Sequence, residues 1–192
     1  RITNQIFPEA ISIPMSREMI ITQWHVPIDD ENCYWYSMFT SFDKPVDKEK
    51  MRAQRLQEHR LPDYAPLKNK ANNYGFDPEE QQRETYTGMG LDINVHDQWA
   101  VESPGAIFDR TKEHLGKTDV AIVKYRRMMR AAIASLKEGS TDALPMVSGV
   151  DVKTIYGPIS NDTIGEKDAW RDAFETSDRA RRKGCNDWDA TV

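Results

Sequence analysis

Two segments near the start of the chain have the pattern of β-strands. Residues 19–28 and 33–42 are rich in β-branched and aromatic residues, and the four polar residues 29–32 separate them. This arrangement predicts an antiparallel hairpin, because a short polar turn lets two such segments pair side by side. Pro27 suits a strand end or a sheet edge, since proline cannot donate a ladder hydrogen bond.

Four later segments are predicted to be helical, at residues 47–60, 94–103, 118–138 and 166–183. Asp47 and Asn94 are the expected N-caps of the first two, because short polar side chains accept hydrogen bonds from the first backbone amides. The third helix is the longest, with apolar residues at helical spacing and Gly139 at its end. Pro104-Gly105 is expected to stop the second helix, and the basic residues 179–183 to complement the dipole of the fourth.

The remaining stretches are predicted as loops. Residues 62–90 show no clear hydrophobic period, and a loop of that length is expected to be either functional or disordered. Glycine and proline recur through residues 140–165, which also indicates a loop. A sheet followed by helices favours an α+β fold over alternating βαβ units.

Composition narrows the class of protein. The 192 residues are 39% hydrophobic, which fits one globular domain. A net charge of −5 argues against nucleic acid and anionic membranes as partners, and no apolar run approaches the ~20 residues that cross a bilayer. Cys33 and Cys185 are too few for a disulfide framework, which favours a reducing, cytoplasmic setting. Because the sequence starts at Arg1 with neither methionine nor signal peptide, we expect its start to be a cut end.

Asp97 lies in the most informative run of the chain, Gly-Leu-Asp-Ile-Asn-Val-His-Asp-Gln-Trp-Ala-Val-Glu-Ser at residues 90–103. Further polar positions follow in order: Gly105, Asp109-Arg110, Glu113-His114-Leu115-Gly116, Asp119 and Arg126-Arg127. Over roughly residues 72–133 the chain resembles Rieske-type aromatic ring-hydroxylating oxygenases, in the branch of phthalate dioxygenases and aryl-ether O-demethylases. The resemblance implies that Asp97 is the carboxylate of a two-histidine, one-carboxylate Fe(II) site. Without the resemblance, the ordinary interpretation is that an aspartate in the first turn of a helix interacts with the positive end of the helix dipole.

His96 departs from the family pattern, where we expect glutamine, and Pro104 and Ala106 depart from it around Gly105. Neighbouring helix residues point about 100° apart, so His96 and Asp97 would chelate one metal poorly. We therefore expect Asn94 and His96 to support the iron site from outside its ligand set, or His96 to lie on the helix surface.

The rest of such a site is missing from the sequence. A Rieske [2Fe-2S] cluster needs Cys-x-His and Cys-x-x-His pairs, and neither cysteine belongs to one. The histidines 25, 59, 96 and 114 are too widely separated to match the family's two closely spaced iron ligands. We expect residues 1–165 to be the C-terminal part of an oxygenase catalytic domain and 166–192 a helix and tail, with the Rieske domain outside the chain. The chain alone is then expected to be inactive.

The resemblance also implies a fold and an activity. The fold would be an incomplete helix-grip domain, a curved antiparallel sheet packed on a long C-terminal helix. Electrons from NADH would pass through a separate reductase and the Rieske cluster to Fe(II), where O2 hydroxylates or O-demethylates an aromatic acid. The resemblance further implies a homotrimer or a higher oligomer, and a role in the catabolism of aromatic compounds.

Two alternatives stay open. His25 and Trp35 are candidate substrate contacts, although a histidine and aromatic residues on strands are equally typical of a core. For the function of the whole chain, the alternative to an oxygenase is a non-redox helix-grip module that binds an apolar or aromatic ligand.

Overall fold

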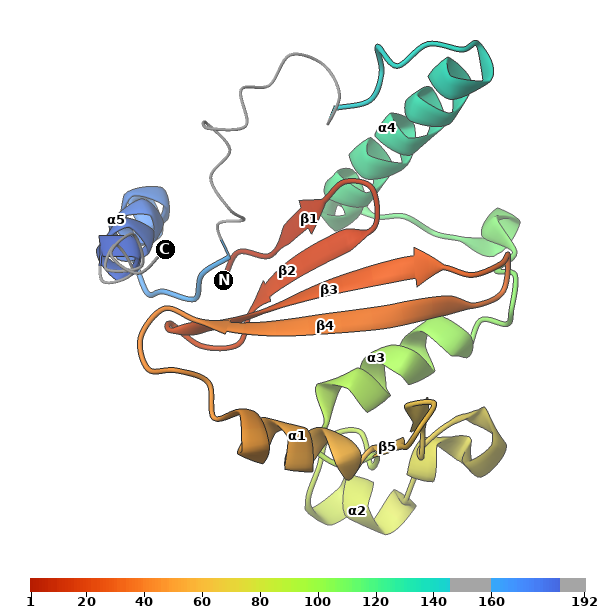
Figure 1. Ribbon diagram of the computed structural model, residues 1–192, viewed down its shortest axis with the longest axis vertical. Coiled ribbons are helices and arrows are strands. Elements are labelled where there is room, and N and C mark those ends of the chain that lie inside the picture. The colour runs from red at the N-terminus through yellow and green to blue at the C-terminus, as the bar shows by residue number, and fades with distance from the viewer. Residues whose placement is uncertain (146–159, 184–192) are drawn as a thin grey trace. The chain divides into compact units, whose positions relative to one another are not determined.

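The computed structural model describes residues 1–145 and 160–183, and its elements make an α+β fold (Figure 1). The chain divides into two compact units, which are described separately. The sheet unit comprises Arg1–Val46 and His114–Val192, and the helical unit comprises Asp47–Glu113. The predicted division at residue 165 stays a prediction.

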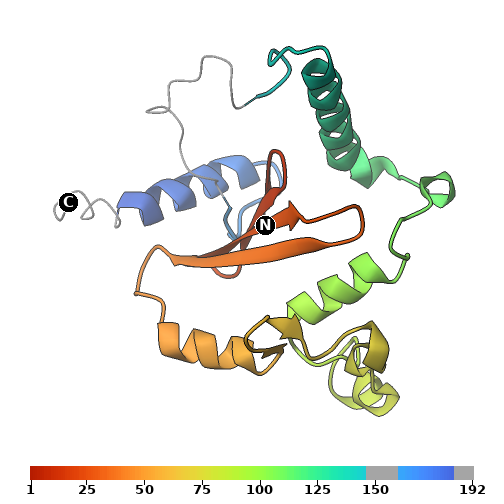
Figure 2. The same ribbon diagram turned by 45° about the vertical axis from the view of Figure 1, so that its right-hand side comes forward.

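The sheet unit contains one four-stranded antiparallel sheet in which each strand pairs with the next along the chain. Its strands are β1 (Asn4–Ile6), β2 (Ala10–Pro14), β3 (Met19–Pro27) and β4 (Cys33–Ser41). The predicted hairpin is confirmed as β3 and β4, the longest strands (Figure 2). Pro27 is the last residue of β3, where its missing N–H costs nothing, and it pairs with Cys33 beside the turn.

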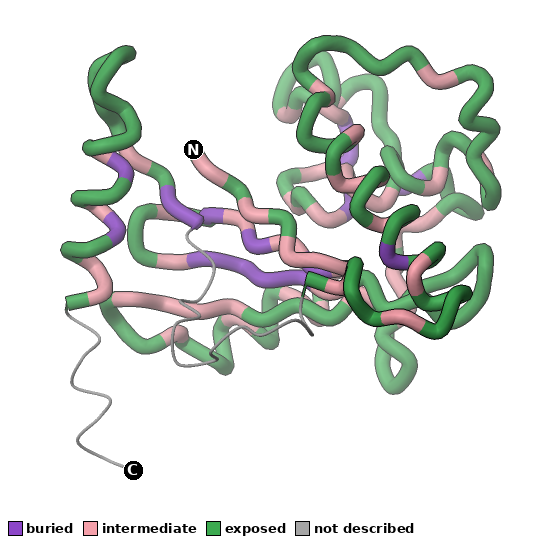
Figure 3. The backbone as a smooth tube through the Cα atoms, turned by 90° about the horizontal axis from the view of Figure 1, so that it is seen from above, coloured by how far each residue is buried: buried purple, intermediate pink, exposed green. Residues whose placement is uncertain are grey.

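The core of the sheet unit lies at the middle of β3. Four consecutive residues there, Ile20, Ile21, Thr22 and Gln23, are at most 5% exposed. Figure 3 colours stretches of the sheet as buried. Because side chains of a strand alternate between two faces, this run means that both faces of β3 are covered there. The hydroxyl of Thr22 donates to that of Ser12 on β2, so a buried polar pair joins the central strands.

The longest helix, α4 (Val120–Lys137), confirms the third predicted helix. Gly139 follows it with φ 75°, a left-handed conformation that glycine adopts without a steric cost. Tyr125 donates a hydrogen bond from its hydroxyl to the carbonyl of Pro8, and its ring lies edge-on to Phe7. Among residues 1–145 and 160–183, no helix combines the length and apolar character needed to cross a bilayer.

The last helix, α5 (Trp170–Lys183), begins four residues later than predicted. Its buried Asp178 accepts hydrogen bonds from both Arg181 and Arg182. Arg181 also donates to the carbonyl of Ser160, and its guanidinium lies 4.2 Å from the ring centroid of Phe42. These basic side chains therefore do more than complement the helix dipole, because they anchor α5 to the end of β4.

In the helical unit, α1 (Lys48–Leu56) confirms the first predicted helix, and the side chain of Asp47 caps it. Residues 62–90 were predicted to be a loop, functional or disordered, and the structure instead gives this stretch short regular elements. This stretch holds β6 (Ala65–Pro66), paired with β5 (His59–Arg60), then η1 (Lys70–Gly75) and α2 (Pro78–Arg83). Side-chain caps from Asn69 and Asp77 start these short helices, which are too brief to produce a hydrophobic period. The predicted loop 140–165 lies mostly outside the described residues.

The anchor of α5 can be tested with Asp178→Asn. The substitution removes the negative charge of a buried ion pair whose side chains are only 7% and 8% exposed, and so breaks the pairing of Asp178 with Arg181. We expect the free energy of unfolding to fall by about 3 kcal/mol. Glu175→Gln is the matched control, since the Glu175–Arg179 pair on the same helix is exposed and should contribute less than about 1 kcal/mol. Equal losses in chemical denaturation would contradict the anchoring role.

Candidate functional site

The candidate iron ligand Asp97 lies on α3 (Ile93–Glu102), which confirms the second predicted helix. The predicted N-cap Asn94 is wrong by two residues. Asp92 caps the helix, and its carboxylate accepts from the backbone N–H of Asn94 at 2.8 Å. The predicted stop is confirmed, because Ser103 ends the helix and Gly105 adopts φ 99°.

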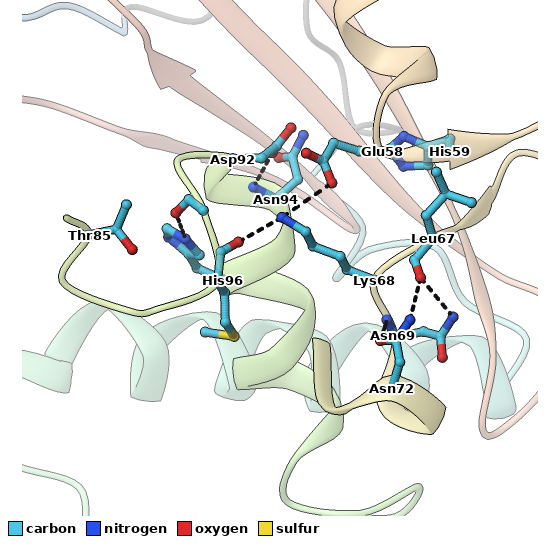
Figure 4. A network of polar contacts seen from close by, with 12 residues as sticks. Glu58, His59, Leu67, Lys68, Asn69, Asn72, Thr85, Asp92, Asn94 and His96 are labelled. Carbon is cyan, nitrogen blue, oxygen red and sulfur yellow. Dashed lines mark hydrogen bonds and ion pairs between the residues drawn. The ribbon is translucent and has the colours of Figure 1, made fainter. Parts of the chain in front are cut away.

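Asp92 also ties α3 to α1. Its carboxylate pairs with the Arg55 guanidinium at 2.7 Å, and the two side chains are 8% and 25% exposed. Beside this pair, the ammonium of Lys68 donates to the Met89 carbonyl at 3.1 Å and lies 3.8 Å from the carboxylate of Glu58 (Figure 4). The start of α3 is thus held by partly desolvated charges, which are screened little by salt.

His96 holds the middle of α3 to the loop before it. Its Nε2 lies 2.9 Å from the Gly90 carbonyl oxygen and 2.9 Å from the Thr87 hydroxyl. A carbonyl oxygen only accepts, so Nε2 must carry the proton in this arrangement. That nitrogen then has no lone pair to offer a metal. The supporting role predicted for His96 and Asn94 stays a prediction.

Tyr74, which contacts the end of α3, lies within the family resemblance but was assigned no role from the sequence. It lies in a left-handed turn, with φ of 52° at Asn73, 57° at Tyr74 and 66° at Gly75. For a residue with a side chain this conformation costs roughly 1–2 kcal/mol. Asn73 and Gly75 are the residue types that tolerate it best, so an Asn-x-Gly triplet was the signal available in the sequence.

The turn buries Tyr74 against α3. Its side chain is 4% exposed and forms a core cluster with Met89 and Val95. Its hydroxyl donates to Oε2 of Glu102 at 2.7 Å, while Gln98 donates to Oε1 of the same carboxylate at 3.1 Å. Burial first, and then the hydrogen bond to Glu102, raise the pKa of Tyr74 to about 12.

Asp97 itself is half-buried and is not a free carboxylate. It points about 100° away from His96 around the helix. Among residues 1–145 and 160–183, no three His, Cys, Asp or Glu side chains cluster in a way that could hold a metal.

His25 and Trp35 are brought together on one face of the hairpin. They are direct partners across β3 and β4, with ring centroids 5.2 Å apart and an edge-to-face angle of 80°. His25 is exposed and Trp35 half-buried. The indole Nε1 of Trp35 is buried and has no hydrogen-bond acceptor in the described part of the chain. Their predicted role in substrate binding stays a prediction.

A groove of about 350 Å³ opens in the helical unit and was not anticipated from the sequence. Its lining residues come from η1, the link between η1 and α2, α2, the loop between α2 and α3, and α3: Asn73, Phe76, Gln81, Tyr86, Thr87, Met89 and Trp99. Trp99 follows Asp97 by two positions, about 200° around the helix, so the groove lies on the side of α3 away from Asp97. Most of these residues lie in the stretch predicted to be a loop.

Comparison with known proteins gives two matches. A family model described as LigXa C-terminal domain like matches residues 1–183. The oxygenase subunit of phthalate 4,5-dioxygenase from Pseudomonas putida is 30% identical over 179 residues, which is 90% of this chain and 39% of that subunit. The chain therefore spans well under half the length of this relative.

The raised pKa of Tyr74 predicts a loss of stability in alkali. Because the folded pKa is about 12 and the ordinary value is 10.0, the stabilisation is fully present below pH 10 and is lost as the pH rises from 10 toward 12. Tyr74→Phe lacks this titration. We expect the difference in free energy of unfolding between the native protein and the variant to shrink across that interval in denaturant titrations. A difference that stays constant above about pH 10 would contradict the burial of the phenol.

Proposed function

This chain belongs to the LigXa C-terminal domain-like family and is the C-terminal part of a Rieske-type oxygenase, and from this membership we propose that Asp97 is its iron ligand. The resemblance predicted from the sequence is thereby confirmed. The complete protein would hydroxylate or O-demethylate an aromatic acid, using O2 and electrons from NADH.

One observation carries the proposal. The family match runs through the whole of α3, and that helix is held along its length by polar contacts that leave Asp97 half-buried. A half-buried carboxylate on a fixed helix is the kind of ligand that a mononuclear Fe(II) site requires.

The described residues supply only one of the three protein ligands that an Fe(II) site of this type needs. Fe(II) of this type takes three protein ligands on one face, and the described residues supply Asp97 without two histidines beside it. We assign the two histidines to the larger part of the subunit that this chain does not cover, because the relative is much longer. When bound, Fe(II) supplies the centre at which O2 is activated next to the substrate.

The substrate side of the proposal rests on His25 and Trp35. The buried indole N–H of Trp35 is a donor without an acceptor among the described residues, and a buried donor of this kind favours an anionic or carbonyl group nearby. A substrate carboxylate would accept from it, and the edge-to-face pair of rings would contact the aromatic ring.

The intact assembly follows from the family. We propose the helix-grip arrangement for the complete catalytic domain, with the [2Fe-2S] Rieske cluster in the region before this chain. A separate reductase would deliver the electrons, and the subunits would form a homotrimer or a higher oligomer in the cytoplasm. The four-stranded sheet and the 18-residue helix α4 are compatible with this arrangement.

Asp97→Ala in the intact oxygenase tests the proposal. It should remove the mononuclear iron and all product formation, and leave the visible spectrum of the Rieske cluster unchanged, because the ligands of the cluster lie in another domain. The matched control is His96→Gln on the same helix. Glutamine can still donate to the Gly90 carbonyl, so iron should be retained, with an affinity loss of at most ~10–100-fold.

Iron per subunit, measured by metal analysis, decides between the outcomes. Iron that disappears in His96→Gln and persists in Asp97→Ala would make the assignment of the ligand wrong. Unchanged binding of an aromatic ligand by an iron-free intact protein would favour the alternative, a non-redox binding module.

The chain expressed by itself gives a second test. It should bind iron weakly and show no iron–sulfur absorption, because it offers one carboxylate where three ligands are needed and has no Cys-x-His pair. Stoichiometric iron that survives dialysis would show that ligands within this chain have been overlooked.

A further inference from the structure

The left-handed turn at residues 73–75 has an unfavourable backbone conformation, and it fixes the position of the Tyr74 side chain. It places the ring of Tyr74 in the core with Val95, which belongs to the first turn of α3. It also places the hydroxyl on Glu102, the last residue of α3. The turn therefore links the core cluster that includes Val95 with the last residue of the helix that carries Asp97.

The other polar contacts of α3 act on its first half. Asp92 is held by Arg55, and His96 is held by the Gly90 carbonyl. The hydrogen bond between Tyr74 and Glu102 is the corresponding support of the last turn, and Gln98 donates to the second oxygen of the same carboxylate. Together these contacts fix the rotation of α3 about its own axis.

Rotation matters because Asp97 lies between the supports. A carboxylate about 6 Å from a helix axis moves by roughly 2 Å when the helix turns by about 20°. Metal–ligand distances tolerate only about 0.2 Å, so a small rotation is enough to lose a ligand. The contact with Glu102 lies about 140° around the helix from Asp97, so it does not occupy the carboxylate.

We infer that Tyr74 is a positioning residue for Asp97, acting through Glu102 to set the rotation of α3 and hence the direction in which the carboxylate meets the metal. This inference rests on the proposed function of Asp97. It assigns no direct contact between Tyr74 and iron or substrate.

The test is Tyr74→Phe in the intact oxygenase, which removes one hydroxyl and keeps the ring in the core. We expect the dissociation constant for Fe(II), measured by competition with a chelator, to rise about tenfold or more, with the Rieske absorption unchanged. Tyr125→Phe is the matched control. It removes a hydroxyl that donates to the Pro8 carbonyl in the sheet unit, so it should lower the melting temperature and leave the iron affinity at the native value.

Glu102 gives a second pair of variants. Glu102→Gln keeps an oxygen that accepts from Tyr74, and its iron affinity should stay near the native value. Glu102→Leu should weaken iron binding as Tyr74→Phe does. The double variant Tyr74→Phe/Glu102→Leu should bind iron no more weakly than Glu102→Leu alone, because that substitution already removes the contact with Tyr74.

The inference is overturned if Tyr74→Phe leaves iron affinity unchanged, or if Tyr125→Phe weakens it equally, which would reflect general destabilisation. The proposed function fails separately, through retention of iron in Asp97→Ala. If that variant loses iron while Tyr74→Phe keeps it, Asp97 is the ligand and Tyr74 does not position it.

Discussion

The short length of α3 is the constraint on which the candidate site depends. A helix of ten residues is marginal in water, because nucleation costs more than so few hydrogen bonds return. Its stability and its orientation must therefore come from the residues around it. Arg55, Gly90 and Tyr74 supply these contacts from three different segments, so the direction of Asp97 depends on the whole of residues 47–113.

Polar contacts hold α3 because apolar packing is scarce there. Val95 is the only buried residue of the helix, while Ile93, Trp99 and Val101 are 54%, 46% and 75% exposed. Apolar burial is non-directional and would let a helix slide or rotate at little cost. Hydrogen bonds weaken steeply with angle, so a few of them at both ends define one rotation.

The six longest elements could be predicted from the sequence, since each had a local signal. The β3–β4 hairpin, α1 and α4 followed from periodicity, a polar turn and caps. The stretch 62–90 could not be predicted, because its helices are shorter than two hydrophobic periods and are held by side-chain caps. The cap of α3 was misplaced because Asn94 and Asp92 are equally good caps locally, and the pairing of Asp92 with Arg55, far away in sequence, could not be read from either residue.

The residues of the candidate site also differ in whether they could be predicted from the sequence. Asp97 could be found from the sequence through its family run, but Tyr74 and Glu102 could not be connected, because a hydrogen bond between residues 28 positions apart has no local signature. The local signal for an unusual turn was the Asn-Tyr-Gly triplet at residues 73–75.

The supports of α3 carry free-energy costs of their own. The desolvation of Asp92 and Arg55 offsets much of their attraction, and the left-handed backbone of Tyr74 costs roughly 1–2 kcal/mol. If stability were the only requirement, a buried leucine would stabilise the helix more than the ion pair or the left-handed turn does. What the ion pair and the turn provide is a single orientation, and a carboxylate with the role we propose for Asp97 needs orientation more than it needs stability.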